Sequence, residues 1–117
     1  MAETTQLELV TPARVMVSKA AEMVVVPGSE GLFGVLPRHS ALLASLQRGV
    51  VEVFESGKVI DRFMIDGGLA DVTPEGVMIL AERAVDLSVT TSQELKERAA
   101  NASDSEADFL NGAIEAL

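Results

Sequence analysis

GVVEVFESGKVIDRFMID, residues 49–66, is the most informative segment of the sequence. It consists of two runs rich in Val, Ile and Phe, separated by Ser56-Gly57. Such runs on either side of a short polar turn predict a β-hairpin with two long strands. In the second strand both alternating faces carry large apolar residues, among them Phe63 on one face and Met64 on the other. We therefore expect this strand to contact other parts of the chain on both sides.

Similar apolar runs lie on both sides of this hairpin, separated by Gly, Pro, Asp and Ser. Thr73-Pro74-Glu75-Gly76 has Pro and Gly where a β-turn requires them. Gly67-Gly68 predicts a bend or bulge where two backbones approach closely. Short strands at even spacing favour a β-sandwich or barrel over a parallel sheet. The predicted strands are residues 6–10, 15–20, 22–26, 34–36, 41–46, 49–55, 58–66, 69–73 and 77–82.

The pattern changes after Thr90, where Ala, Glu and Lys replace Val and Gly. Thr91 with Glu94, and Ser103 with Glu106, have the spacing of capping boxes, which predicts helix starts near Ser92 and Asp104. The second helix would place Ala107, Leu110, Ile114 and Leu117 on one apolar stripe. A helix of this length is marginal alone, so we expect it to dock on another surface. The sequence thus predicts a β-sandwich domain, residues 1–86, and a short helical hairpin, residues 87–117.

Composition excludes several classes of function. The chain has 117 residues, no cysteine and a net charge of −9, which repels nucleic acid and anionic lipid. Residues 82–117 carry eight acidic and three basic side chains, so the tail is the more acidic part. The N-terminus lacks the basic and apolar regions of a secretory signal, and no apolar run is long enough to span a bilayer. We expect no direct membrane insertion, although a partner protein could hold the chain beside a membrane.

Two features invite a catalytic or ligand-binding interpretation. The three glycines of the Gly28–Gly34 loop could cradle phosphate, but no Lys-Ser/Thr pair follows and Glu30 has the wrong charge. A turn that needs a positive φ is the simpler account, and the apolar pair Leu32-Phe33 at its tip would then mark a contact surface. His39 is the only histidine, and neither a nucleophile-elbow motif nor a zinc ligand set accompanies it. A structural or interface role is the default for His39.

One family shares the ensemble of these residues. The shared positions are Pro27-Gly28, Gly31, Gly34, Leu36-Pro37, His39, Leu42-Leu43, Leu46, Gly49, Gly67-Gly68, Val72 and Ile79-Leu80-Ala81. By their spacing, the chain resembles the epsilon subunits of bacterial F-type ATP synthases, whose mitochondrial counterpart is called delta. The resemblance covers roughly residues 6–84.

The resemblance implies a flattened β-sandwich of about ten strands followed by a helical hairpin. It also implies a non-catalytic rotor subunit on the cytoplasmic side of the bacterial inner membrane, peripheral to it. Such a subunit binds the gamma subunit and the ring of c subunits in the central stalk, and couples proton flow to ATP synthesis. By the same resemblance, Glu30, Gly31, Leu32 and Phe33 would contact the c-ring. His39, Ser40 and Leu42 would lie near gamma or the ring.

The C-terminus departs from the family pattern. Some epsilon subunits bind ATP through an acid-x-x-Arg-Ala motif, of which Glu94, Glu97 and Arg98 form only a displaced remnant here. Lys96 and Arg98 are the last basic residues, so contact with the acidic surface of the alpha/beta catalytic head would be weak. We therefore expect weak or absent inhibition of ATP hydrolysis and no cofactor. The alternative interpretation is a free-standing small-molecule-binding or hydrolytic β-domain that uses His39 and the Gly28–Gly34 loop.

Overall fold

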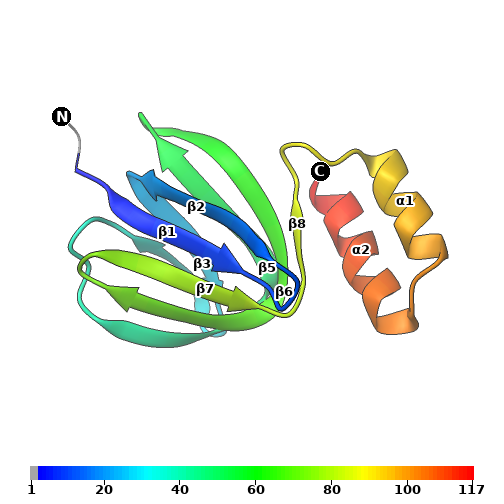
Figure 1. The fold of residues 1–117 in the computed structure, drawn as a ribbon, viewed down its shortest axis with the longest axis horizontal. Helices are drawn as coiled ribbons and strands as arrows, with labels where there is room; N and C mark the ends of the chain where they lie inside the picture. Colours follow the sequence, from blue (N-terminus) through cyan, green and yellow to red (C-terminus); the bar gives the residue numbers. More distant parts are fainter. Residues whose placement is uncertain (1–2) are drawn as a thin grey trace.

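The computed structural model describes residues 3–117, which form eight strands and two helices (Figure 1). The molecule is elongated, with extents of 44 × 26 × 25 Å, and the two helices lie at one end of the long axis. The elements are β1 (Thr5–Val10), β2 (Val15–Ala21), β3 (Met23–Gly28), β4 (Gly31–Val35), β5 (Leu42–Glu55), β6 (Lys58–Thr73), β7 (Gly76–Ala81), β8 (Ala84–Asp86), α1 (Ser92–Ala100) and α2 (Asp104–Ala116).

The strands form one sheet that folds over into two layers. Its order is β2-β1-β7-β6-β5-β3-β4, with β8 paired to β6. The first half of β5 and the second half of β6 lie in the layer with β7, β1 and β2. Their other halves lie in the layer with β3, β4 and β8. The two long strands of the predicted hairpin therefore belong to both layers, which explains their apolar residues on both faces.

The change of layer occurs at Gly67-Gly68. Both residues have positive φ, 73° and 143°, and a Cβ at position 68 would lie 2.0 Å from the Leu80 carbonyl oxygen. Only glycine accommodates both the conformation and the close approach. The predicted bend is thereby confirmed. The strand boundaries assigned around it were wrong, because β6 continues through the bend and β5 continues past Gln47 opposite it. The strands therefore number eight among residues 3–117, with β8 missed by the sequence analysis.

Both predicted turns and both predicted helix starts are confirmed. Ser56 and Gly57 have φ of 54° and 75°, the conformation that a two-residue hairpin requires. The Thr91 side chain accepts a hydrogen bond from the Glu94 amide at 3.2 Å, and the Ser103 side chain accepts one from the Glu106 amide at 3.4 Å. These N-caps satisfy amides that have no partner inside the helices.

The molecule has two apolar cores. The larger lies between the sheet layers and is built from β1, β3, β5, β6 and β7; its largest fully buried members include Leu7, Leu9, Phe63, Ile65 and Ile79. The smaller lies under the helices and consists of Met64, Val85, Leu87, Leu95, Phe109, Leu110 and Ala113.

The apolar stripe predicted for α2 was rotated from the true one. Phe109, Leu110 and Ala113 are the buried residues of α2, whereas Leu117 is exposed. Phe109 and Leu110 are consecutive, so they cannot both lie on one narrow stripe. Because α2 packs on the sheet and on α1 at once, it buries a wider arc of its surface. Neither helix among residues 3–117 is long and apolar enough to cross a bilayer.

Candidate functional site

The turn between β3 and β4 forms an exposed tip at one end of the sheet. Gly28 pairs with Gly31, and Ser29 and Glu30 are the two residues between them. A Cβ at Gly28 would lie 2.7 Å from the Gly31 carbonyl oxygen, so the tight turn needs glycine there. Leu32 is 71% exposed, whereas Phe33 packs against the larger core. The expectation of an exposed Leu32-Phe33 pair was therefore right for Leu32 and wrong for Phe33, since successive strand residues face opposite sides.

The structure brings this tip against the start of β5. The Ser29 amide donates to the Ser45 carbonyl at 2.9 Å, and the Gln47 side chain donates to the Gly28 carbonyl at 2.9 Å. Between the two segments lies a cavity of about 300 Å³. Its lining includes Glu30, Gly31 and Phe33 from the tip, together with Leu42 and Leu43 from β5. Four of the residues expected at the c-ring or at gamma thus share one concave surface.

His39 and Ser40 lie on a separate segment, residues 36–41, which joins β4 to β5. His39 Nδ1 lies 2.7 Å from the Ser40 carbonyl oxygen, and the Arg38 amide donates to the Pro74 carbonyl at 3.1 Å. Within residues 3–117, no hydrogen bond joins His39 to a carboxylate, and His39 does not line the cavity at the β3–β4 tip. Because a triad needs an acid that orients the histidine, this arrangement supplies no hydrolytic centre.

A metal centre needs several ligand side chains that lie close together. Residues 3–117 contain no group of three or more His, Cys, Asp or Glu side chains that could hold a metal ion.

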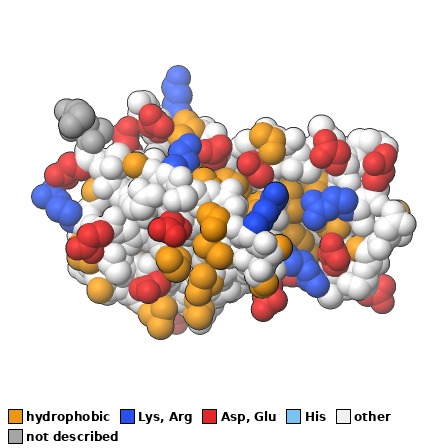
Figure 2. Space-filling view, viewed as in Figure 1, with side chains coloured by type: hydrophobic (Ala, Val, Ile, Leu, Met, Phe, Trp, Pro, Cys, Tyr) orange, Lys and Arg blue, Asp and Glu red, His pale blue; other side chains and the backbone are white. Residues whose placement is uncertain are grey.

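An exposed apolar surface on the outer side of the sheet was not predicted from the sequence. We call Leu43, Leu69, Met78 and Leu80 the outer apolar face. They come from β5, β6 and β7, which are adjacent: Leu69 pairs with Leu80, and Asp71 pairs with both Leu43 and Met78. All four side chains are at least 40% exposed, and Leu43 reaches 69%. Figure 2 shows hydrophobic side chains gathered over the region that β7 occupies in Figure 1.

The outer apolar face continues in two directions. Leu43 also lines the cavity at the β3–β4 tip. Leu69 and Leu80 line a second hollow, of about 510 Å³, together with Val10 and Pro12 of β1 and the turn after it. The face is apolar except for the exposed carboxylate of Asp71, which lies between Leu43 and Met78. Exposed apolar patches are typical of surfaces that contact other proteins. The unbroken apolar run Val77–Leu80 was its signal in the sequence, because a strand with one solvated face alternates.

The residues of the displaced ATP motif lie on an exposed part of the hairpin. Glu94, Glu97 and Arg98 line a shallow hollow of about 550 Å³ that also includes Glu106. Three carboxylates thus surround one guanidinium. This balance disfavours a triphosphate, which needs an excess of positive charge.

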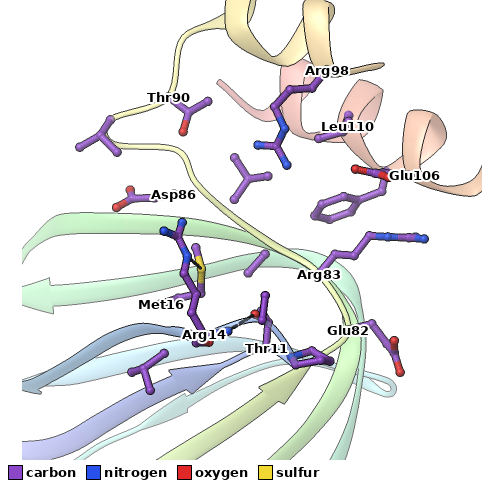
Figure 3. A pocket seen from close by; sticks show the side chains of 17 residues that line it. Thr11, Arg14, Met16, Glu82, Arg83, Asp86, Thr90, Arg98, Glu106 and Leu110 are labelled. Carbon is purple, nitrogen blue, oxygen red and sulfur yellow. Dashed lines mark hydrogen bonds between the residues drawn. The ribbon is translucent and has the colours of Figure 1, made fainter. Parts of the chain in front are cut away.

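A further cavity, of about 520 Å³, separates the β1–β2 turn from the helices (Figure 3). Arg14 and Arg98 extend into it from opposite sides, and Arg83 passes beneath α2 (Figure 3). Its three arginines are matched by the carboxylates of Glu82, Asp86 and Glu106. The lining therefore has no net charge and provides no selectivity for an anion.

The similarity to known proteins agrees with the architecture. The family model of the ATP synthase delta/epsilon chain, β-sandwich domain, matches residues 4–87. The ATP synthase epsilon chain of Rhodospirillum rubrum is 43% identical over 104 residues, which cover 89% of this chain and 78% of the relative. That of Hyphomonas neptunium is 46% identical over 95 residues, covering 81% and 70%.

Solved structures share the fold. A chain of the Euglena gracilis mitochondrial ATP synthase superimposes with a TM-score of 0.66 at 24% identity, over 96% of this chain and 76% of that one. A chain from the central stalk and c-ring of the Tetrahymena thermophila enzyme gives 0.62 at 13% identity, over 97% and 92%. With the residues matched by the family model and the identity to bacterial relatives, these findings show that the chain belongs to the epsilon subunits of the ATP synthase delta/epsilon family, which are non-catalytic subunits.

Proposed function

We propose that this chain is a central-stalk subunit of a proton-translocating F-type ATP synthase, on the cytoplasmic side of the bacterial membrane. It binds the gamma subunit and the c-ring, and it helps to pass rotation from the ring to the catalytic head. Membership in the epsilon family supports this role. The observation that carries it is that the outer apolar face and the β3–β4 tip share Leu43 and so form one surface. Such a surface can contact two neighbouring partners at once.

The two parts of this surface suit different partners. The outer apolar face offers large aliphatic side chains on a rigid sheet, which favours a stable contact with gamma. The tip presents Glu30, Gly31 and Leu32 on a short turn, which suits contact with loops of the ring, and Phe33 supports the tip from the core. Leu42 lines the cavity between the tip and β5. We propose that His39 and Ser40, on the segment that precedes β5, contact gamma or the ring. We propose that residues 1–86 form the body and residues 87–117 the hairpin, a division supported by the end of β8 at Asp86.

The contact with gamma is testable by a charge placed on the outer apolar face. Leu80→Asp leaves the core unchanged, because Leu80 is exposed, but it buries a carboxylate if gamma covers the face. We expect affinity for purified gamma, measured by biolayer interferometry, to fall by about thirty-fold or more, as for a central interface residue.

Val59→Asp is the matched control for this experiment. Val59 is exposed to a similar degree but lies beside the Ser56-Gly57 turn, away from the outer apolar face. It should bind gamma like the unmodified chain. Equal affinity of the Leu80→Asp chain and the control would refute the assignment of this face to gamma.

We further propose that the hairpin neither binds ATP tightly nor inhibits ATP hydrolysis strongly. The three carboxylates around Arg98, and the absence of basic residues in α2, support this. A ligand at one hundred times its dissociation constant stabilises a folded chain by about 2.7 kcal/mol. We expect 1 mM ATP (roughly that multiple for a site with a dissociation constant of about 10 μM) to leave the melting temperature unchanged, with ADP and sulfate as controls. A rise of several degrees with ATP alone would contradict the proposal.

A further inference from the structure

The helical hairpin is tied to the β-sandwich through α2 rather than through α1. Within residues 3–117, the side-chain hydrogen bonds and ion pairs between the helices and the β-sandwich domain run from three arginines to α2. Two of them, Arg48 and Arg62, lie in β5 and β6, and Arg83 lies in the link between β7 and β8. Arg48 donates to Asp108 at 2.8 Å, Arg83 to the Ser105 hydroxyl at 3.3 Å, and Arg62 to the Ala116 carbonyl at 2.8 Å. The last element of the chain is thus the one that anchors the hairpin, and α1 packs on α2.

Asp66 lies at the centre of this arrangement. Its Oδ1 accepts from Arg48 Nε at 2.8 Å and its Oδ2 accepts from Arg83 Nη1 at 2.9 Å. Within residues 3–117, no hydrogen bond or ion pair joins Asp66 directly to α2, and the Asp66 side chain is only 16% exposed. One carboxylate therefore fixes two of the three guanidinium groups that reach the helix, those of Arg48 and Arg83. The hydrogen bonds that Arg48 donates to Asp66 and Asp108 also raise the pKa of Arg48 above its usual value.

The charges on the two sides are complementary. α2 carries four carboxylates, those of Asp104, Glu106, Asp108 and Glu115, and no basic residue. The Arg48 guanidinium also lies 5.8 Å from the centre of the Phe109 ring, which belongs to the apolar core under the helices. The Arg48–Asp108 ion pair and the contact of Arg48 with the Phe109 ring therefore act on the same stretch of α2.

We propose that Asp66 is a positioning residue that holds the hairpin against the body by orienting Arg48 and Arg83 toward α2. When the carboxylate is neutralised, the two arginines lose their common partner and the hairpin opens as a unit, while the sheet keeps its own core. This inference concerns the isolated chain and does not depend on its role in the ATP synthase.

The test is hydrogen exchange of the full chain, read by mass spectrometry at peptide level. Asp66→Asn keeps the size of the side chain but removes its charge. We expect exchange in α1 and α2 to accelerate by about five- to thirty-fold, with β1 and β7 unchanged. Asp71→Asn is the matched control, because Asp71 lies on the same strand but is exposed and, within the described residues, forms no ion pair.

Salt provides a second measurement that simple loss of packing would not affect. The screening length falls from about 30 Å at 0.01 M salt to about 3 Å at 1 M. Exchange in α2 of the unmodified chain should therefore accelerate with salt, and the Asp66→Asn chain should have lost most of that dependence. Asp108→Asn, which removes one exposed end of the network, should act on the same residues more weakly.

Two results would overturn the inference. The first is unchanged exchange in α2 of the Asp66→Asn chain. The second is equal acceleration in β1, β7 and α2, which would indicate general destabilisation instead of opening of the hairpin. Acceleration confined to α1 and α2, with salt dependence lost, supports it.

Discussion

Thr5 illustrates how a single atom can lower the stability of a well-packed sheet. Its side chain is fully buried in β1, and its hydroxyl oxygen has no hydrogen-bond partner within the described residues. A buried polar group without a partner costs about 1–3 kcal/mol, because it leaves water without compensation. This could not be predicted from the sequence, since Thr is common in strands and the polar groups near its side chain depend on the fold.

Thr5→Val should stabilise the chain. Valine has nearly the same shape and no hydroxyl, so we expect the free energy of unfolding to rise by about 1 kcal/mol and the melting temperature by about 4 °C. Urea denaturation measures the free energy of unfolding and thermal denaturation measures the melting temperature, each followed by circular dichroism. Thr4→Val, at an exposed neighbouring position, should change neither. A Thr5→Val chain no more stable than the original would mean that the hydroxyl has a partner in solution.

At the scale of elements, the turns, the bend and the helix caps could be predicted from the sequence, whereas the strand boundaries that depend on long-range pairing could not. The Ser56-Gly57 turn, the Gly67-Gly68 bend and the caps at Thr91 and Ser103 each depend on a few adjacent residues, and the structure has all of them. The continuity of β6 through its bend depends on pairing with both β5 and β7, which no local pattern specifies. The strand was therefore divided in the prediction.

The candidate interaction surface was predictable to a similar extent. The tip around Glu30 and Leu32 was expected from its glycines and from the family resemblance, and the structure joins it to Leu42 at one cavity. The outer apolar face was missed because it unites side chains from three strands. Leu43 and Leu80 are far apart in sequence, and only the sheet order, with β6 between β5 and β7, places them on one face. The ion pairs of Asp66 with Arg48 and Arg83 were not predicted for the same reason, because these residues are brought together only by the fold.

At the scale of the whole molecule, the body and the hairpin share the smaller core. Met64 and Val85 belong to the sheet but are buried under Phe109 and Leu110 of α2. Removal of the hairpin therefore does more than delete an appendage, because it exposes apolar side chains of the sheet to water.

A chain truncated after Leu87 should fold but be less stable. The larger core is intact without the helices, whereas uncovering Met64, Val85 and Leu87 should cost about 3 kcal/mol or more. The midpoint of urea denaturation measures the loss, and binding of a hydrophobic dye should increase. Met64→Gln in the truncated chain should reduce dye binding. A truncated chain with an unchanged midpoint would show that the smaller core contributes nothing to the body.

The folded-over sheet has a mechanical consequence. Because β5 and β6 run without a break from one layer into the other, the two layers have no seam along which they could slip. Sideways load on the outer apolar face is carried along the backbone of two paired strands into the opposite layer. To separate the layers, this load would have to break all the hydrogen bonds between β5 and β6 together, not one after another. A torque applied at one face would therefore reach the other with little elastic loss.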